Sequence, residues 1–152
     1  RQRGSRQSSE LGQCLPALLT PTGRLELGQR LIGLAHSAID ISDGLMADLG
    51  HILTNSEQAA CIHIAAIPSS PTLKGYLHQS LAIQCLLAGG DDYELCFTAP
   101  KMNRGKIEAL AIELAIPLTC IGEIVSGKGL VVQDAEGNAI TLETKGYDHF
   151  SA

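Results

Sequence analysis

Two spacings of apolar residues organise the middle of the chain. Residues 38–41 (AIDI) are apolar or small apart from one aspartate, and an acidic, hydroxyl-bearing bend follows them, which is typical of a strand that ends in a turn. From position 45 the apolar residues recur at helical intervals, so a helix is expected over about 45–55. Ser42 or Asp43 is expected to cap the first turn of this helix, and Asn55 with Ser56 is expected to end it. The central stretch is therefore predicted to be a strand, a bend and a helix.

The same two spacings predict the rest of the fold. Further helices are expected where apolar residues recur every three or four positions, at 25–35, 77–87 and 103–114. Strands are expected where apolar residues run together or alternate, at 60–67, 93–98, 118–121, 129–133 and 139–142. A loop is expected at 69–75, and a turn at 136–138 joins the last two strands as a hairpin. Strands and helices alternate before this hairpin, so the sequence predicts an α/β or α+β fold with a mixed β-sheet packed against helices.

The composition argues against several classes of function. The 152 residues are 45% apolar, which is enough for one domain with a core. The net charge of -5 and the aromatic content of 3% make binding to nucleic acid or to anionic lipid unexpected. No apolar run approaches the roughly 20 residues that a membrane helix needs. The five cysteines are scattered and form no C-x-x-C pair, so we expect reduced thiols in a cytoplasmic protein.

Two segments are assigned no chemistry. Residues 1–13 are polar and lack periodicity, so they are predicted to be a flexible tail before a domain at 14–152. Residues 122–129 (GEIVSGKG) match a phosphate-binding loop only up to the lysine, because Gly129 replaces the hydroxyl residue and a strand pattern follows. We interpret 122–129 as a glycine-rich β-turn. The histidines, including His63 in a predicted strand, show no zinc-ligand spacing.

The predicted strand-to-helix bend contains two carboxylates and a hydroxyl group, those of Asp40, Asp43 and Ser42. A capped helix start explains Ser42 and Asp43, but not Asp40, because a carboxylate in an apolar strand loses water at a cost of roughly several kcal/mol unless it is paired. Residues 33–73 contain no Lys or Arg. Mg²⁺ takes one or two carboxylates and leaves its other positions to phosphate and water. The bend is thus either a helix cap or a site for Mg²⁺ and phosphate. In the second case the free N–H groups at the start of the helix would also favour the phosphate.

A second acidic cluster, Asp91 and Asp92, follows the glycine pair Gly89 and Gly90. Two glycines let a backbone or a ligand come close, and the carboxylates could receive a cationic or amine-bearing substrate. A solvated entry into the next strand is the alternative interpretation. The spacing of these residues does not decide between the two interpretations.

Three separated segments in the same order resemble the C-terminal domain of the thiamine-monophosphate kinase family. They are 38–52 (AIDISDGLMADLGHI), 87–100 (LAGGDDYELCFTAP) and 145–150 (KGYDHF). The first segment is also similar to relatives that share the aminoimidazole ribonucleotide synthetase-like fold, among them selenophosphate synthetase and a hydrogenase maturation protein. The GGDDYEL part of the second segment distinguishes the thiamine-monophosphate kinase family from these relatives. The resemblance implies the aminoimidazole ribonucleotide synthetase-like fold. It also implies a Mg²⁺-dependent transfer of the γ-phosphoryl of ATP to thiamine monophosphate, which gives thiamine diphosphate.

The resemblance also implies roles for five residues. Asp40 and Asp43 would be magnesium ligands, and Ser42 would contact ATP. Asp91, where the family usually has Glu, and Tyr147 would contact the thiamine moiety. No side chain is assigned as a catalytic acid, base or nucleophile, because phosphoryl transfer depends mainly on alignment and charge neutralisation.

The family's enzymes have a further, N-terminal domain that carries most of the ATP and magnesium site and forms a homodimer. The resemblance therefore implies that residues 14–152 are the C-terminal domain of a two-domain kinase, and that this chain is inactive alone. Two alternatives remain open. The chain could belong to another ATP-dependent enzyme of the superfamily with a different acceptor, or it could be a non-catalytic α/β domain whose acidic residues are only caps and solvated turns.

Overall fold

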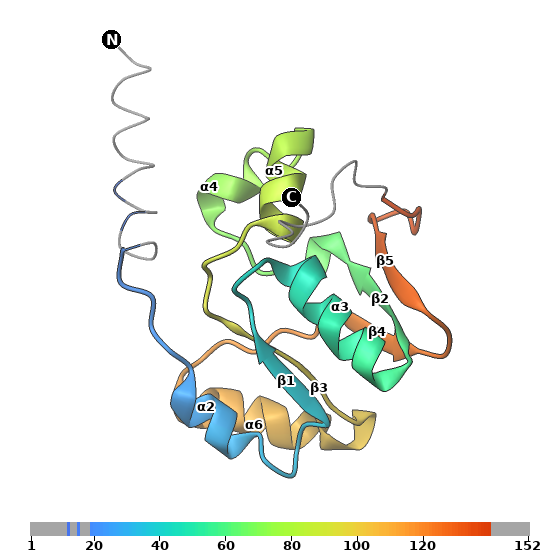
Figure 1. The fold of residues 1–152 in the computed structure, drawn as a ribbon. Coiled ribbons are helices and arrows are strands. Elements are labelled where there is room, and N and C mark those ends of the chain that lie inside the picture. The colour runs from blue at the N-terminus through green and yellow to red at the C-terminus, as the bar shows by residue number, and fades with distance from the viewer. Residues whose placement is uncertain (1–11, 13–14, 16–18, 141–152) are drawn as a thin grey trace, which may run out of the picture.

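The computed structural model describes residues 19–140 together with Gly12 and Leu15. Two small sheets lie between helices on opposite sides (Figure 1). The elements follow in the order α2 (Leu25–Arg30), β1 (Ser37–Asp40), α3 (Leu45–Ser56), β2 (Ala59–His63), η1 (Ile64–Ala66), α4 (Pro71–Lys74), α5 (Ser80–Ala88), β3 (Leu95–Thr98), η2 (Lys101–Asn103), α6 (Arg104–Leu114), β4 (Gly122–Val125) and β5 (Gly129–Gln133). The predicted tail, except for Gly12, and the segment that holds Tyr147 lie outside the described residues.

The strand pairing is mixed, as predicted. β1 pairs with β3 in antiparallel fashion, from Ser37 opposite Thr98 to Asp40 opposite Leu95. In the second sheet β2 is central, antiparallel to β4 and parallel to β5. Gln133 forms an antiparallel bridge with Ala139, which confirms the turn between them. The mixed three-stranded sheet and the flanking helices confirm the predicted fold class, although the strands form two sheets and not one.

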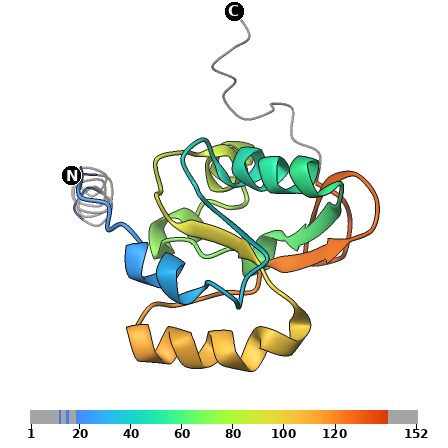
Figure 2. The same ribbon diagram turned by 60° about the horizontal axis from the view of Figure 1, so that its bottom comes forward.

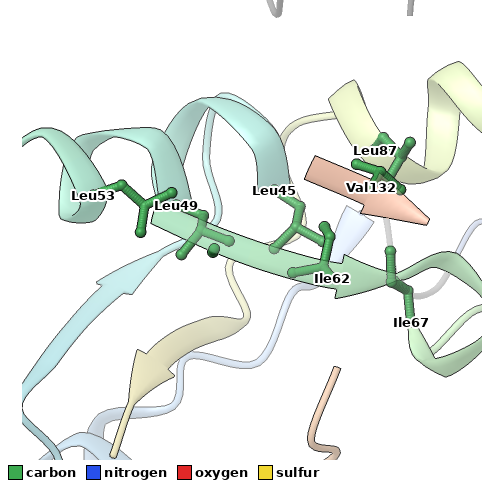
Figure 3. Packing of buried hydrophobic residues seen from close by; sticks show 8 residues of the cluster. Leu45, Leu49, Leu53, Ile62, Ile67, Leu87 and Val132 are labelled. Atoms are coloured by element: carbon green, nitrogen blue, oxygen red, sulfur yellow. The ribbon is translucent and has the colours of Figure 1, made fainter. Parts of the chain in front are cut away.

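Two apolar clusters fill the space on either side of the sheets. In the larger one α3 packs against β2, β5 and α5, and its side chains point toward one another across the gap (Figure 3). Its buried members are Leu45, Leu49, Leu53, Ala60, Ile62, Ile67, Leu87 and Val132. In the smaller one Leu27 and Leu31 meet Leu110 of α6. Figure 2 shows α6 on the side opposite α3.

Several predicted boundaries were wrong. The helix expected at 25–35 ends at Arg30. The strand expected at 60–67 ends at His63, and the chain continues as the short 3₁₀ helix η1. The expected loop at 69–75 contains the short helix α4, because the Ser70 side chain accepts the Leu73 amide and Pro71 starts the helix.

One strand lies four residues later in the chain than predicted. The strand expected at 118–121 instead lies at β4, within the glycine-rich segment 122–129. A Cβ at Gly122 would collide with the backbone of Cys61 in β2, so a glycine is needed where these strands approach. The interpretation of 122–129 as a β-turn was therefore wrong for most of the segment: 122–125 form β4, 126–128 form a bend, and Gly129 begins β5.

No helix within the described residues is both long enough and apolar enough to cross a bilayer.

Candidate functional site

The two acidic segments lie side by side, joined by backbone hydrogen bonds beyond the ends of β1 and β3. The Ile41 amide donates to the Glu94 carbonyl at 2.8 Å, and the Tyr93 amide donates to the Ile41 carbonyl at 2.9 Å. The Asp91 amide donates to the Ser42 carbonyl at 2.9 Å. The segment 40–43 and the segment 91–94 are therefore one continuous surface, although some fifty residues separate them in sequence.

Glycines permit this approach of the two segments. A Cβ at Gly90 would collide with the carbonyl oxygen of Ser42. Gly44 has a φ of +110°, and a Cβ there would lie 2.8 Å from the carbonyl carbon of Ala88, at the end of α5. Glycine is the residue that accepts both the close contact and the positive φ. The sequence prediction that the glycine pair admits a close backbone is thus confirmed at Gly90.

The start of α3 differs from the prediction. Its N-cap is Gly44, which has no side chain to cap with, so the expected capping by Ser42 or Asp43 was wrong. Instead, Asp48 in the first turn folds back, and its Oδ2 accepts the amides of Ser42 at 2.9 Å and Asp43 at 3.1 Å. Asp48 is only 3% exposed. The helix ends at Ser56, as expected from the Asn55-Ser56 pair, and its C-cap Glu57 adopts the left-handed conformation.

Sequence reasoning missed Asp48. The sequence feature that could have identified Asp48 is its place in the first turn of an apolar helix, where an acidic residue complements the helix dipole. Conversely, Asp40 does not lose its water as predicted, because its side chain is exposed at the end of β1. A carboxylate at a strand end reaches solvent even when the strand's other residues are apolar.

The other predicted site residues lie around the same bend. Ser42 and Asp43 are half-buried, and Asp91 is exposed. Asp91 has a φ of +64° and accepts a hydrogen bond from the Tyr93 hydroxyl at 3.2 Å. Tyr147 lies outside the described residues, so its predicted contact with this surface is not described.

The surface is strongly acidic. The pKa of Asp92 is raised, first by partial burial and then by the neighbouring charges of Glu94 and Asp91. The pKa of Tyr93 is raised mainly by its hydrogen bond to Asp91 and by the charge of that carboxylate, with a smaller effect from Asp40. Carboxylates of both segments thus act on one tyrosine, and the combined field favours a cation.

An open groove of about 480 Å³ runs between α2 and this surface. Asp40, Tyr93 and Leu95 line one side, and Leu25 and Ile32 line the other. The two residues on the α2 side are 78% and 82% exposed. At the rim Arg24 and Glu94 form a two-point ion pair, with Nη2 to Oε1 at 2.6 Å and Nε to Oε2 at 2.8 Å. The lining of the groove is therefore mainly apolar, and Asp40 is the acidic residue that borders it.

The carboxylates fit part of a magnesium site. Within residues 19–140 no three His, Cys, Asp or Glu side chains come together as a metal cluster. Asp40 and Asp43 would therefore supply only one or two ligands, which suits Mg²⁺ when phosphate oxygens and waters complete the shell. The amides of Ser42 and Asp43 are bonded to Asp48, so the expectation that free N–H groups here bind an anion was wrong for these two.

Known proteins are similar to this chain over most of its length, although no protein-family model matches it. The thiamine-monophosphate kinase of Escherichia coli K12 is 44% identical over 133 residues, which are 88% of this chain and 41% of that protein. The thiamine-monophosphate kinase of Haemophilus influenzae is also 44% identical, over 136 residues, with 87% and 41% covered. The chain thus spans about two fifths of the length of these relatives.

Solved structures give the same result. The thiamine-monophosphate kinase of Stenotrophomonas maltophilia matches with a TM-score of 0.73 and 47% identity over 82% of this chain and 39% of that one. AaThiL, solved in complex with AMPPCP and TMP, matches with a TM-score of 0.69 and 32% identity over 90% and 40%. The hydrogenase maturation protein HypE of E. coli, at 22% identity and a TM-score of 0.64, shares the fold. The resemblance indicated by the acidic segments is therefore confirmed: over the two fifths of their length that it spans, the chain is a homologue of the thiamine-monophosphate kinases.

Proposed function

We propose that this chain forms the acidic side of a kinase site that transfers the γ-phosphoryl of ATP to thiamine monophosphate. The observation that carries the proposal is the pairing of segments 40–43 and 91–94, which brings the carboxylates of both into one surface. The AMPPCP and TMP bound to the homologue AaThiL support a nucleotide and TMP as the two substrates.

In the proposed reaction an oxygen of the substrate's phosphate forms a bond to the γ-phosphorus of ATP. The bond between that phosphorus and the oxygen bridging it to the β-phosphate breaks, and ADP leaves. When bound, Mg²⁺ would neutralise the charge of the phosphates that must approach each other. The residues of this chain that fit it are Asp40 and Asp43, both at the bend after β1.

The remaining side chains would orient the substrates. The Ser42 hydroxyl would donate to a phosphate oxygen of ATP. Asp91, whose backbone is bonded to Ser42 itself, would face the cationic thiamine body, and Tyr147 would pack against it. Because Asp91 is one methylene shorter than Glu, we expect a weaker contact than that of the Glu in other members of the family. The carboxylates of Asp91 and Glu94, whose charges add to the effect of burial in raising the pKa of Asp92, favour the same cation.

We also propose a cytoplasmic homodimer for the complete enzyme, with Mg²⁺ and ATP bound mostly by a domain that this chain does not include. The 41% coverage of the relatives supports the two-domain proposal. On this view the chain alone makes no thiamine diphosphate.

A hybrid enzyme tests the function directly. This chain is joined to the part of the E. coli kinase that it does not span, and ADP formation is followed with ATP and Mg²⁺. We expect turnover that depends on thiamine monophosphate and that other phosphate acceptors do not support. A folded hybrid that uses a different acceptor would contradict the substrate, and turnover by the chain alone at the hybrid's rate would contradict the need for a second domain.

A further inference from the structure

Asp48 is the charged side chain that the core encloses within the described part of the chain, at 3% exposure. It lies in the first turn of α3, between Leu45 and Leu49, both of which belong to the larger apolar cluster. Its charge also reaches β3, because the pKa of the Cys96 thiol is raised to about 11, first by burial and then by Asp48. A carboxylate in such a place is retained only if specific hydrogen bonds replace its water.

Those hydrogen bonds go to the bend itself. A single oxygen, Oδ2, accepts the amides of Ser42 at 2.9 Å and Asp43 at 3.1 Å. The carbonyl of Ser42 is held in turn by the Asp91 amide at 2.9 Å. Each of the two peptide units that flank Ser42 is thus bonded twice. Its N–H donates to Asp48, and its carbonyl, that of Ile41 or of Ser42, accepts an amide of the second acidic segment.

We propose that Asp48 is a positioning residue, which fixes the backbone of Ser42 and Asp43 so that their side chains meet ATP and Mg²⁺. The inference rests on the proposed kinase function. Because Asp48 occupies both amides, a phosphate cannot take them, and recognition falls to the hydroxyl of Ser42 and the carboxylates of Asp40 and Asp43. Asp48 therefore acts through its neighbours and not by contact with the substrates.

A purely structural role for Asp48 would be to complement the dipole of α3. The two roles differ in what they affect. Dipole stabilisation changes the stability of the whole helix, whereas positioning changes the order of residues 42–43 and the amount of Mg²⁺ that the site requires.

Three variants separate these roles. Asp48→Leu removes the acceptor but keeps an apolar volume, and Asp48→Asn keeps one acceptor oxygen without the charge. Leu49→Ala, the next residue of α3 and 3% exposed, is the control for a destabilised core. Amide hydrogen exchange of this chain is read by NMR at Ser42 and Asp43, relative to the amides of α5 in the same variant.

We expect Asp48→Leu to speed relative exchange at Ser42 and Asp43 roughly tenfold or more, because each amide loses its acceptor. Asp48→Asn should fall between Asp48→Leu and the wild type, and Leu49→Ala should leave the ratio unchanged. If Asp48→Leu does not fold, Asp48→Asn is read in the same way. Exchange equal to that of Leu49→Ala would overturn the inference.

The hybrid enzyme supplies the second readout. The Mg²⁺ concentration for half-maximal rate should rise roughly tenfold in Asp48→Leu, recover in part in Asp48→Asn, and stay unchanged in Leu49→Ala. Faster exchange without a higher Mg²⁺ requirement would overturn the positioning role. A wild-type hybrid with no kinase activity would refute the proposed function, and the exchange experiment would still decide whether Asp48 holds the bend.

Discussion

Single residues decide how closely the two acidic segments approach. Gly90 touches the carbonyl of Ser42 so tightly that a Cβ has no room, and Asp48 bonds the amides on the other side of the bend. The site is therefore held by atoms that would not touch the substrates. Its geometry should be sensitive to small changes at these positions.

Gly90→Ala tests this contact. We expect a loss of about 1 to 3 kcal/mol in the free energy of unfolding, because either Ser42 or the segment before β3 must move to admit the methyl group. The measurement is urea denaturation. Gly50→Ala in α3 is the matched control, because nothing lies within 4 Å of its Cβ, and it should gain about 0.5 to 1 kcal/mol from helix propensity. Equal effects at the two positions would show that the contact does not constrain the segments.

Sequence reasoning identified Asp40, Ser42, Asp43 and Asp91 from their types and spacing, and the structure brings the segments that carry them together. It misjudged which carboxylate is buried. Asp48 is buried where it accepts the amides of Ser42 and Asp43, at a bend that packs closely against Gly90 and Ala88. Those contacts are distant in sequence, so local spacing does not contain them.

At the scale of elements, α3 organises the larger core. Its apolar side chains contact β2, β5 and α5 together, and Leu87 of α5 is completely buried against them (Figure 3). The helix carries the acidic bend at its start, so the packing of α3 and α5 also places the bend. Loss of this packing should lower the free energy of unfolding.

Leu87→Ala should lower the free energy of unfolding by about 2 to 5 kcal/mol, because the side chain is 0% exposed and leaves a cavity. Leu81→Ala on the same helix is the control. Its side chain is 66% exposed, and the change should stay within about 0.5 kcal/mol beyond helix propensity. Chemical denaturation of both variants gives the comparison, and similar losses would contradict the assignment of the core.

The elements with regular spacing were predicted well. The helices α3 and α6 and the strand β5 lie where periodicity placed them. The helix α4 was missed because it is four residues long and depends on the Ser70 cap and on Pro71, not on an apolar stripe. The strand β4 was misplaced because its position is set by pairing with β2, which is distant in sequence.

At the scale of the whole molecule, one long-range strand pairing places the two acidic segments side by side. The antiparallel register of β1 and β3 brings Asp40 opposite Leu95, and the backbone bonds beyond it join the two acidic segments. Alternating strands and helices predicted a mixed sheet, but not which strands pair. The chain spans 41% of the length of its E. coli relative, so we expect the rest of the active site to come from the part of the kinase that this chain does not span.

The most direct test of the account is the magnesium dependence of the hybrid enzyme with Asp40→Asn. The thiamine monophosphate-dependent rate of ADP formation is measured against Mg²⁺ concentration, with Glu108→Gln on α6 as the control for loss of one surface charge. We expect Asp40→Asn to raise the Mg²⁺ concentration for half-maximal rate at least roughly tenfold, and the control to leave it unchanged. An Asp40→Asn hybrid with the magnesium dependence of the wild type would contradict the claim that this bend holds the metal against phosphate.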